Sequence, residues 1–226
     1  MNAEILYSDA DIVVVVKPPG VYVHPAPGHG QGTLSEFLVR RFPDMAGVGS
    51  ETRPGVVHRL DAGTSGVMVF ARTRRAYLKL RADFEGHERV AKTYLALLHG
   101  APKEKKGTLE FTVGRKPWDA RRMAVGVPGG KRAVTHWEVL ARKGALALVE
   151  FSIETGRTHQ IRLAAAQLGH PVVGDDLYGD AAADRRMGRR APHLMLHAVT
   201  LEFDHPVTGR RLSFSAPPPP EMVYAC

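Results

Sequence analysis

Cysteine is nearly absent from this chain, because its only one, Cys226, is the last residue. A single cysteine excludes an internal disulfide and is typical of a reducing compartment. Long apolar runs are lacking as well, and the longest early one, residues 12–16, is far too short to span a bilayer. Acidic residues at Glu4, Asp9 and Asp11 do not fit a signal peptide. We therefore expect a soluble, cytoplasmic protein.

Motifs for metals and nucleotides are also lacking. Eleven histidines are present, but none has the spacing of a known zinc motif and no cysteine can join them. His193 and His197 lie four apart without a neighbouring acidic ligand. No glycine pattern of the P-loop or dinucleotide type occurs. We therefore expect no metal and no cofactor.

Positive charge is in excess, since 31 Lys and Arg against 23 Asp and Glu give a net charge of +8. Such a balance suits a polyanionic partner, although many basic proteins bind none. A length of 226 residues with 44% apolar content suffices for one substantial core. Because no internal repeat or Gly/Ser linker divides the chain, we predict a single domain over residues 1–226.

Short apolar runs bounded by glycine and proline predict about eight or nine strands, among them residues 12–16, 56–57, 67–71 and 90–98. Only three clear helices are expected, and they begin near Thr33, Thr73 and Thr158. Thr33 and Glu36 have the spacing of a capping box, and Thr158 is a reasonable N-cap. Strands and helices do not alternate regularly. This predicts an α+β fold with a largely antiparallel, mixed central sheet flanked by a few helices and loops.

Polar side chains gather between the runs 56–57 and 67–71. One imidazole, one guanidinium, one carboxylate and two hydroxyls lie within eight residues, at His58, Arg59, Asp61, Thr64 and Ser65. A carboxylate kept ionised by a cation is typical of a general base or nucleophile. The alternative is a turn aspartate that caps the loop, since such residues are common.

Two other places carry unusual polar residues. The run 157–162 is too polar for the start of a half-buried helix, unless its groups have partners. It is either an exposed helix start or a segment that places Arg162 against Asp61 and keeps that carboxylate ionised. Tyr94 lies in the middle of a strand, where a core aromatic is the plain interpretation.

Five ordered stretches over residues 12–198 resemble the motifs of the RluA-type RNA pseudouridine synthases. They are Lys17-Pro18-Pro19-Gly20 with His24-Pro25, the run 53–61 around His58-Arg59-Leu60-Asp61, the run 91–96, the runs 155–162, 169–171 and 174–179, and Leu196-His197-Ala198. The resemblance implies the catalytic fold of a pseudouridine synthase. It also implies an enzyme that isomerises uridine in structured RNA to its C-glycoside without a cofactor.

The resemblance also implies residue roles. Asp61 would be the catalytic aspartate, Tyr94 would pack on the target base and assist loss of the C5 proton, and Arg162 would pair with Asp61. Arg59 would enter the RNA stack where the flipped uridine leaves. The other matched polar residues would bind substrate, namely His58, Thr64, Arg157, His159 and Gln160. Basic loops at 115–132 and 185–190 would meet phosphates.

Several points stay open at this stage. The target RNA could be ribosomal RNA of the large subunit or a tRNA loop, and the sequence does not choose between them. It also does not choose between attack of Asp61 at C1′ and removal of the C2′ proton by Asp61. Ala62-Gly63 and Leu163-Ala164 depart from the family's usual residues. The chain begins directly at the resembled catalytic domain, without the small RNA-binding module that often precedes it, so we expect the catalytic domain itself to recognise the target. We also expect a monomer.

Two other functional classes are the alternatives. One is a non-catalytic RNA-binding or ribosome-assembly factor on the same fold, against which the joint presence of Asp61, Tyr94 and Arg162 argues. The other is a glycosidase, which would need a second active-site carboxylate that no motif supplies.

Overall fold

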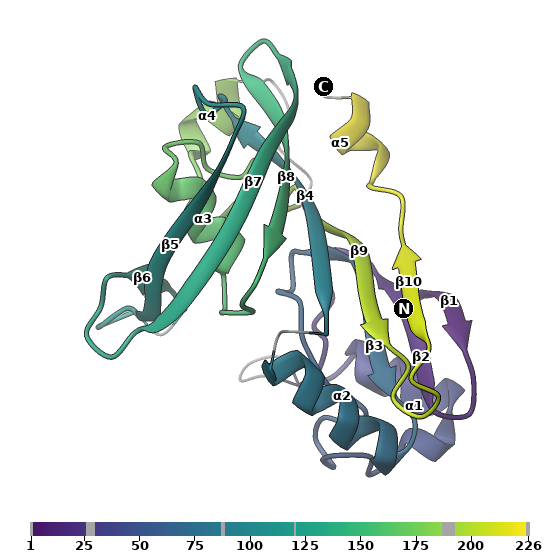
Figure 1. Cartoon of the computed structure of the whole chain (residues 1–226). Coiled ribbons are helices and arrows are strands. Elements are labelled where there is room, and N and C mark those ends of the chain that lie inside the picture. Colours follow the sequence, from purple (N-terminus) through teal and green to yellow (C-terminus); the bar gives the residue numbers. More distant parts are fainter. Residues whose placement is uncertain (1, 26–29, 87–88, 120, 187–192, 225–226) are drawn as a thin grey trace. The chain divides into compact units, whose positions relative to one another are not determined.

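The structure is a computed structural model in which two compact units can be distinguished. Unit 1 comprises residues 1–92 and 198–217, and unit 2 comprises residues 93–197 and 218–226. The structure describes residues 2–25, 30–86, 89–119, 121–186 and 193–224 (Figure 1). That the whole chain acts as a single catalytic domain stays a prediction.

Unit 1 is built on antiparallel strands with an apolar centre. β1 (Glu4–Ser8) pairs with β2 (Ile12–Lys17), and β2 pairs with β3 (Ser65–Ala71). β3 neighbours β9 (Leu196–Asp204), which in turn pairs with β10 (Arg211–Ser215). Valines dominate β2 and recur in β3, and β-branched side chains favour strands. Every residue of β3 is buried, so this strand forms the middle of the core of unit 1.

Two helices and a short turn complete unit 1. α1 (Leu34–Arg41) begins at the capping box that the sequence predicts, in which Thr33 and Glu36 bind each other's backbone. The 3-10 turn η1 (Pro43–Met45) follows. α2 (Arg74–Gly86) packs on β3, and it contributes apolar side chains to the same core, namely Ala76, Leu80 and Phe84.

Unit 2 contains a second antiparallel set of strands in the order β4–β8–β7–β5–β6. Their bounds are Ala91–His99 for β4, Lys106–Arg115 for β5, Met123–Val125 for β6, Lys131–Lys143 for β7 and Leu146–Ile153 for β8. α3 (Gln160–Gln167) packs on β6 and β7. Alternation along β4 buries Tyr94 with Ala96 and Leu98, as the sequence predicts.

The expected α+β fold with a mostly antiparallel sheet is confirmed, although two local predictions are wrong. Residues 56–57 form no strand, because only Val56 makes an isolated bridge, to Phe70. Thr158 is not an N-cap, because α3 begins one residue later than such a cap requires. Its N-cap is His159, with a left-handed φ of 58° and no side-chain capping bond.

Two short helices were not expected from the sequence. α4 (Ala181–Arg186) lies within the arginine-rich segment, and α5 (Pro220–Tyr224) follows the proline run. Proline at the first position of α5 removes no helical hydrogen bond, because that N–H has no partner within the helix. Within the described ranges, no helix is long and apolar enough to cross a membrane.

Candidate active site

Asp61 lies in a tight turn that leads directly into β3. The Thr64 amide donates to the Asp61 carbonyl at 3.1 Å, which closes the turn. Asp61 is half-buried, whereas Thr64 is only 2% exposed. A carboxylate at this place keeps access to solvent while its backbone is fixed by the buried strand that follows.

Lys17 fastens this turn from the end of β2. Its fully buried ammonium donates to the carbonyls of Pro18 at 2.9 Å, Val21 at 2.8 Å and Ala62 at 2.8 Å. Burial lowers the pKa of Lys17 to about 7, and the negative charge of Asp61 opposes that shift. Sequence reasoning assigns no role to Lys17, and the only signal for it is the Lys-Pro-Pro-Gly motif.

His58 supports the segment before Asp61. Its Nε2 accepts the Val69 amide of β3 at 3.1 Å, and its ring stacks on Phe84 at 4.3 Å between ring centres. Burial lowers the pKa of His58 to about 3, and the Lys92 charge adds to the shift. The neutral ring therefore joins the loop to the core of unit 1, and the substrate contact expected from the sequence stays a prediction.

Arg59 lines a pocket of unit 1 with a volume of about 450 Å³. Its side chain is exposed, and it makes no hydrogen bond or ion pair with any residue that the structure describes. This guanidinium, two residues before Asp61, is available to a ligand, and its entry into an RNA stack stays a prediction.

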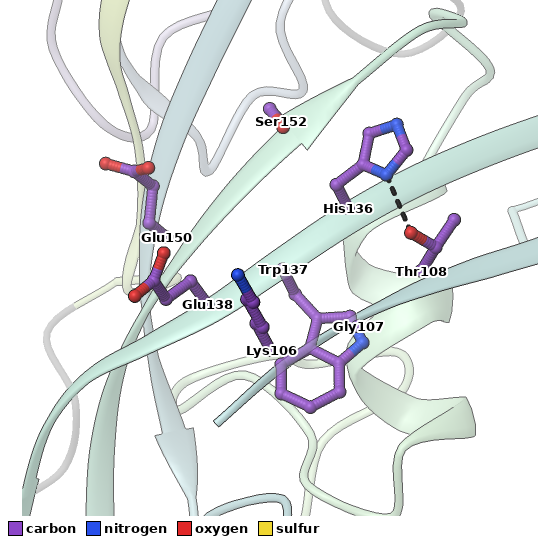
Figure 2. Close-up of a pocket in the computed structure, with 8 residues that line it drawn as sticks. All are labelled: Lys106, Gly107, Thr108, His136, Trp137, Glu138, Glu150 and Ser152. Atoms are coloured by element: carbon purple, nitrogen blue, oxygen red, sulfur yellow. Dashed lines mark hydrogen bonds between the residues drawn. The ribbon is translucent and has the colours of Figure 1, made fainter. Parts of the chain in front are cut away.

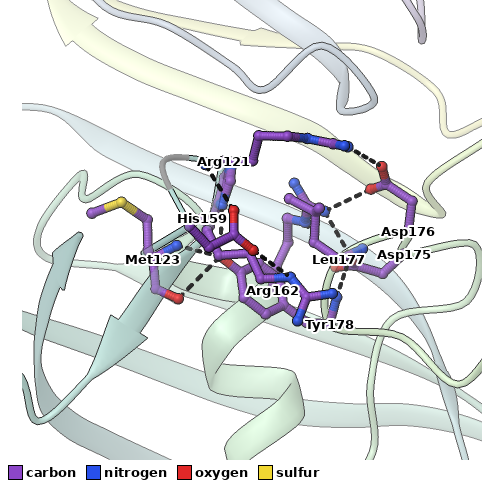
Figure 3. Close-up of polar contacts among 10 residues, drawn as sticks. Arg121, Met123, His159, Arg162, Asp175, Asp176, Leu177 and Tyr178 are labelled. Atoms are coloured by element: carbon purple, nitrogen blue, oxygen red, sulfur yellow. Dashed lines mark hydrogen bonds and ion pairs between the residues drawn. The ribbon is translucent and has the colours of Figure 1, made fainter. Parts of the chain in front are cut away.

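In unit 2, Arg162 is bound by two neighbouring carboxylates (Figure 3). Its Nε and Nη2 donate to the two Asp175 oxygens at 2.7 and 2.6 Å, and Nη2 also contacts Asp176 at 3.2 Å. Burial would raise the pKa of Asp175, but the Arg162 guanidinium and the amides of Tyr178 and Leu177 outweigh it and lower the pKa.

Asp175 is thus a site residue that sequence reasoning did not single out. Its signal was the stretch Gly174-Asp175-Asp176, which was matched to a family motif without a role for either carboxylate. The expected pairing of Arg162 with Asp61 joins residues of the two units and stays a prediction.

Tyr94 and Gln160 are buried in unit 2. Tyr94 is 8% exposed and faces Phe151 across the β4–β8 pair. Gln160 is 3% exposed, and its amide binds Thr155, the Arg157 amide, the Val134 carbonyl and Thr135. These bonds hold Gln160 at the start of α3, and the substrate contact expected from the sequence stays a prediction.

The remaining expected substrate residues of unit 2 are less buried. The ring of His159 lies edge-on to that of Tyr178, and its Nδ1 lies 2.8 Å from the Tyr178 hydroxyl, which also accepts the Met123 amide at 2.7 Å. Arg157 donates from Nε to the Arg132 carbonyl at 3.0 Å. RNA contacts by His159 and Arg157 stay predictions.

Some arginines of the basic loops form ion pairs at the surface. Arg121, Arg122 and Arg132 lie near acidic residues, at 3.5 Å from Asp176, 3.4 Å from Asp119 and 2.7 Å from Glu110. In the second loop, Arg185 and Arg186 are exposed ends of α4, while residues 187–190 lie outside the described residues. Phosphate binding by these loops stays a prediction.

A second pocket, of about 480 Å³, lies on the sheet of unit 2 (Figure 2). None of the expected site residues lines it. Glu138 and Glu150 face each other there across β7 and β8, beside Lys106. Two carboxylates repel phosphate, so this pocket does not suit an RNA strand. Within the described part of the chain, no group of three or more His, Cys, Asp or Glu side chains could hold a metal.

Comparisons with known proteins agree on one family. The family model described as RNA pseudouridylate synthase matches residues 11–167. An uncharacterized RNA pseudouridine synthase of Synechocystis is 43% identical over 96% of this chain and 65% of its own length. A ribosomal large subunit pseudouridine synthase D of Pseudomonas aeruginosa is 41% identical over 99% of this chain and 71% of its own length.

Solved structures give the same picture. The structure titled Human RNA Pseudouridylate Synthase Domain Containing 1 matches with a TM-score of 0.78 at 31% identity, over 96% of this chain and 84% of that chain. The chain is thus shorter than the proteins it matches, and it spans about two thirds of the length of the first curated relatives.

Proposed function

Because the chain belongs to the RNA pseudouridylate synthase family, we propose that it isomerises specific uridines of structured RNA to pseudouridine. The observation that carries this proposal is the Asp61 turn, which is half-buried, fixed by Lys17 and followed by buried β3. Binding alone needs basic residues, whereas a positioned carboxylate beside an unpaired arginine suits chemistry on a ribose.

The reaction begins when the target uridine leaves its stack, which costs a few kcal/mol. Arg59 fills the gap and offsets part of that cost. The Asp61 carboxylate then acts on the ribose, either by attack at C1′ or by removal of the C2′ proton to give a glycal. In both routes the bond from C1′ to N1 breaks and the uracil rotates. C5 then bonds to C1′ as the bond from Asp61 to C1′ breaks or, in the glycal route, as the protonated Asp61 returns the proton to C2′. The C5 proton is lost with help from Tyr94.

Large-subunit ribosomal RNA is the first substrate to test, because several relatives are named for it. A tRNA loop is the second. One cysteine and an RNA substrate together fit action in the cytoplasm, and we expect a monomer. A non-catalytic RNA-binding factor is the outcome that the experiment below distinguishes.

Tritium release from RNA labelled at uridine C5 tests the proposal directly. Total rRNA and tRNA from a strain lacking the gene are incubated with the wild type, with Asp61→Asn and with Asp44→Asn, an exposed carboxylate of unit 1. We expect release by the wild type and by Asp44→Asn, and a loss of at least about a thousandfold in Asp61→Asn, because removal of the nucleophile abolishes the chemical step.

RNA affinity should stay within a few-fold in Asp61→Asn, since the variant keeps every cation. Substantial turnover by that variant would show that another group acts on the ribose. No release by the wild type, with RNA binding intact, would favour the binding factor.

A further inference from the structure

The pocket beside Arg59 contains two further side chains, His24 and Arg53, to which the proposed reaction gives no role. It is formed within unit 1 by the loop that precedes Asp61, by His24 and by one side of α2. Arg53 and Arg59 from the loop and Arg81 from α2 line it, together with the hydroxyls of Ser50 and Thr52. None of the residues described as its lining carries a negative charge.

The positive charge of this pocket is compensated only in part. Arg53 and Arg59 make no ion pair and no side-chain hydrogen bond with any residue in the described ranges. Arg81 is bound to Glu85 through Nε at 3.0 Å and lies 5.9 Å from the centre of the Tyr77 ring. Two exposed guanidiniums at one pocket favour an anion, and in RNA that anion is a phosphate.

His24 lines the same pocket, and its protonation state decides which group of a ligand it can bind. It is only 6% exposed, and its Nδ1 lies 2.8 Å from the Pro25 carbonyl. A carbonyl only accepts, so Nδ1 carries the proton. Burial lowers the pKa of His24 and the charges of Arg53 and Arg59 lower it further, against the bond to Pro25. The ring is therefore neutral at pH 7.

Nε2 of this neutral ring is an acceptor, and it has no hydrogen-bond partner among the residues that the structure describes. It can accept from a hydroxyl but not from a phosphate oxygen. A ligand that presents an anion to the arginines and a hydroxyl donor to the imidazole fits both. The ribose 2′-hydroxyl is the donor that distinguishes RNA from DNA.

We propose that this pocket binds a second ribonucleotide of the substrate strand, with its phosphodiester at Arg53 and its ribose 2′-hydroxyl donating to Nε2 of His24. This inference rests on the proposed function for the identity of the strand. The pocket would distinguish RNA from DNA at a nucleotide other than the target uridine.

The apolar wall of the pocket fits a sugar and base. Val56, Val57 and Tyr77 line it. The Tyr77 ring lies directly against Gly49, where an added Cβ would be 2.3 Å from the ring and where φ is +82°. The Tyr77 ring thus packs closely on the Gly49 backbone, which leaves no room there for a larger residue.

The test compares a short fluorescein-labelled oligouridylate with its all-2′-deoxy counterpart by fluorescence anisotropy. The wild type should bind the ribose form about three- to tenfold more tightly than the deoxy form because of the His24 bond. His24→Phe should lose most of that preference while keeping its affinity for the deoxy form. An unchanged preference in His24→Phe, or none in the wild type, overturns the proposal.

Arg53→Gln provides a second variant that leaves His24 in place. We expect its RNA affinity to fall about three- to tenfold and its salt dependence to weaken by about 0.7 in log–log slope, as for one lost phosphate contact on a single strand. Arg74→Gln is the matched control, because Arg74 is an exposed residue of α2 outside the pocket. An equal effect in both variants would contradict a phosphate site at Arg53.

Tritium release by the same preparations separates this proposal from the proposed function. If the wild type releases tritium but His24→Phe discriminates ribose as the wild type does, only the pocket proposal fails. If no release occurs but the preference depends on His24, the pocket proposal stands and the proposed reaction fails.

Discussion

The Asp61 turn of unit 1 and the Arg162 cluster of unit 2 stabilise charges by different means. Around Asp61, a buried ammonium binds three backbone carbonyls and a neutral imidazole binds a backbone amide. Around Arg162, two carboxylates bind the guanidinium directly. The arginine pair keeps its charges over a wide pH range, whereas the pKa of Lys17 at about 7 makes the Asp61 turn sensitive to pH.

Asp175→Asn should have the largest effect on stability. It removes the buried carboxylate that binds both Nε and Nη2 of Arg162, whose side chain is 6% exposed, and loss of one partner of a buried ion pair costs about 3–5 kcal/mol. Urea unfolding at pH 7 measures this loss. Asp176→Asn is the matched control, because Asp176 is 71% exposed and its loss should cost less than about 1 kcal/mol. Equal losses in the two variants would show that burial does not separate the two carboxylates.

Lys17→Met should remove the pH sensitivity of the Asp61 turn. The folded-state pKa of about 7 lies below the ordinary value of 10.5, so between these values the unfolded chain binds more protons than the folded one. The contribution of Lys17 to stability therefore increases as the pH rises through that window. Relative to Lys17→Met, the wild type should gain about 2 kcal/mol between pH 7 and pH 9.

Urea unfolding of both proteins at several pH values measures this difference. A constant difference would mean that the three carbonyls and Asp61 keep the lysine charged throughout. The tritium-release rate of Lys17→Met should also fall at least about tenfold, since Ala62 beside the carboxylate loses its anchor and positioning contributes strongly to rate.

His58→Phe should have a smaller effect on stability, with a pH dependence of the same sign as that of Lys17 but at lower pH. It leaves the Val69 amide without its acceptor, at a cost of about 1–2 kcal/mol. Because the folded-state pKa of about 3 lies below the ordinary 6.5, the contribution of His58 is present above pH 6.5 and is lost as the pH falls. The wild type should lose about 1 kcal/mol relative to the variant between pH 6.5 and 5.5. Parallel unfolding curves at the two pH values would contradict a buried neutral ring.

The charge reversals Arg185→Glu and Arg186→Glu should have the smallest effect on stability. Both residues are exposed at the end of α4, so the free energy of unfolding should change by less than about 0.5 kcal/mol. RNA affinity should nevertheless fall, and more so at low salt, if the segment meets phosphates. Unchanged affinity at low salt would remove this segment from the RNA interface.

Features that depend on neighbours along the chain were predictable from the sequence. The capping box of Thr33 and Glu36 involves two residues three apart, and the alternation that buries Tyr94 is a property of one strand. The Asp61 turn lies between the apolar runs 56–57 and 67–71, and the polar residues between these runs predict a turn. Local spacing fixes such features because the backbone geometry of a turn, cap or strand allows few alternatives.

Features that depend on which strands become neighbours were decided by the tertiary structure. α3 begins at Gln160, one residue later than an N-cap at Thr158 would place its start. At that position the Gln160 amide donates to the Val134 carbonyl and the Thr135 hydroxyl of β7. Lys17 reaches Ala62 over 45 positions of sequence, and the unpaired charge of Arg53 comes to lie at the same pocket as His24. The sequence shows which polar side chains are present. The hydrogen-bond partners of a buried polar group depend on the segments that folding places next to it.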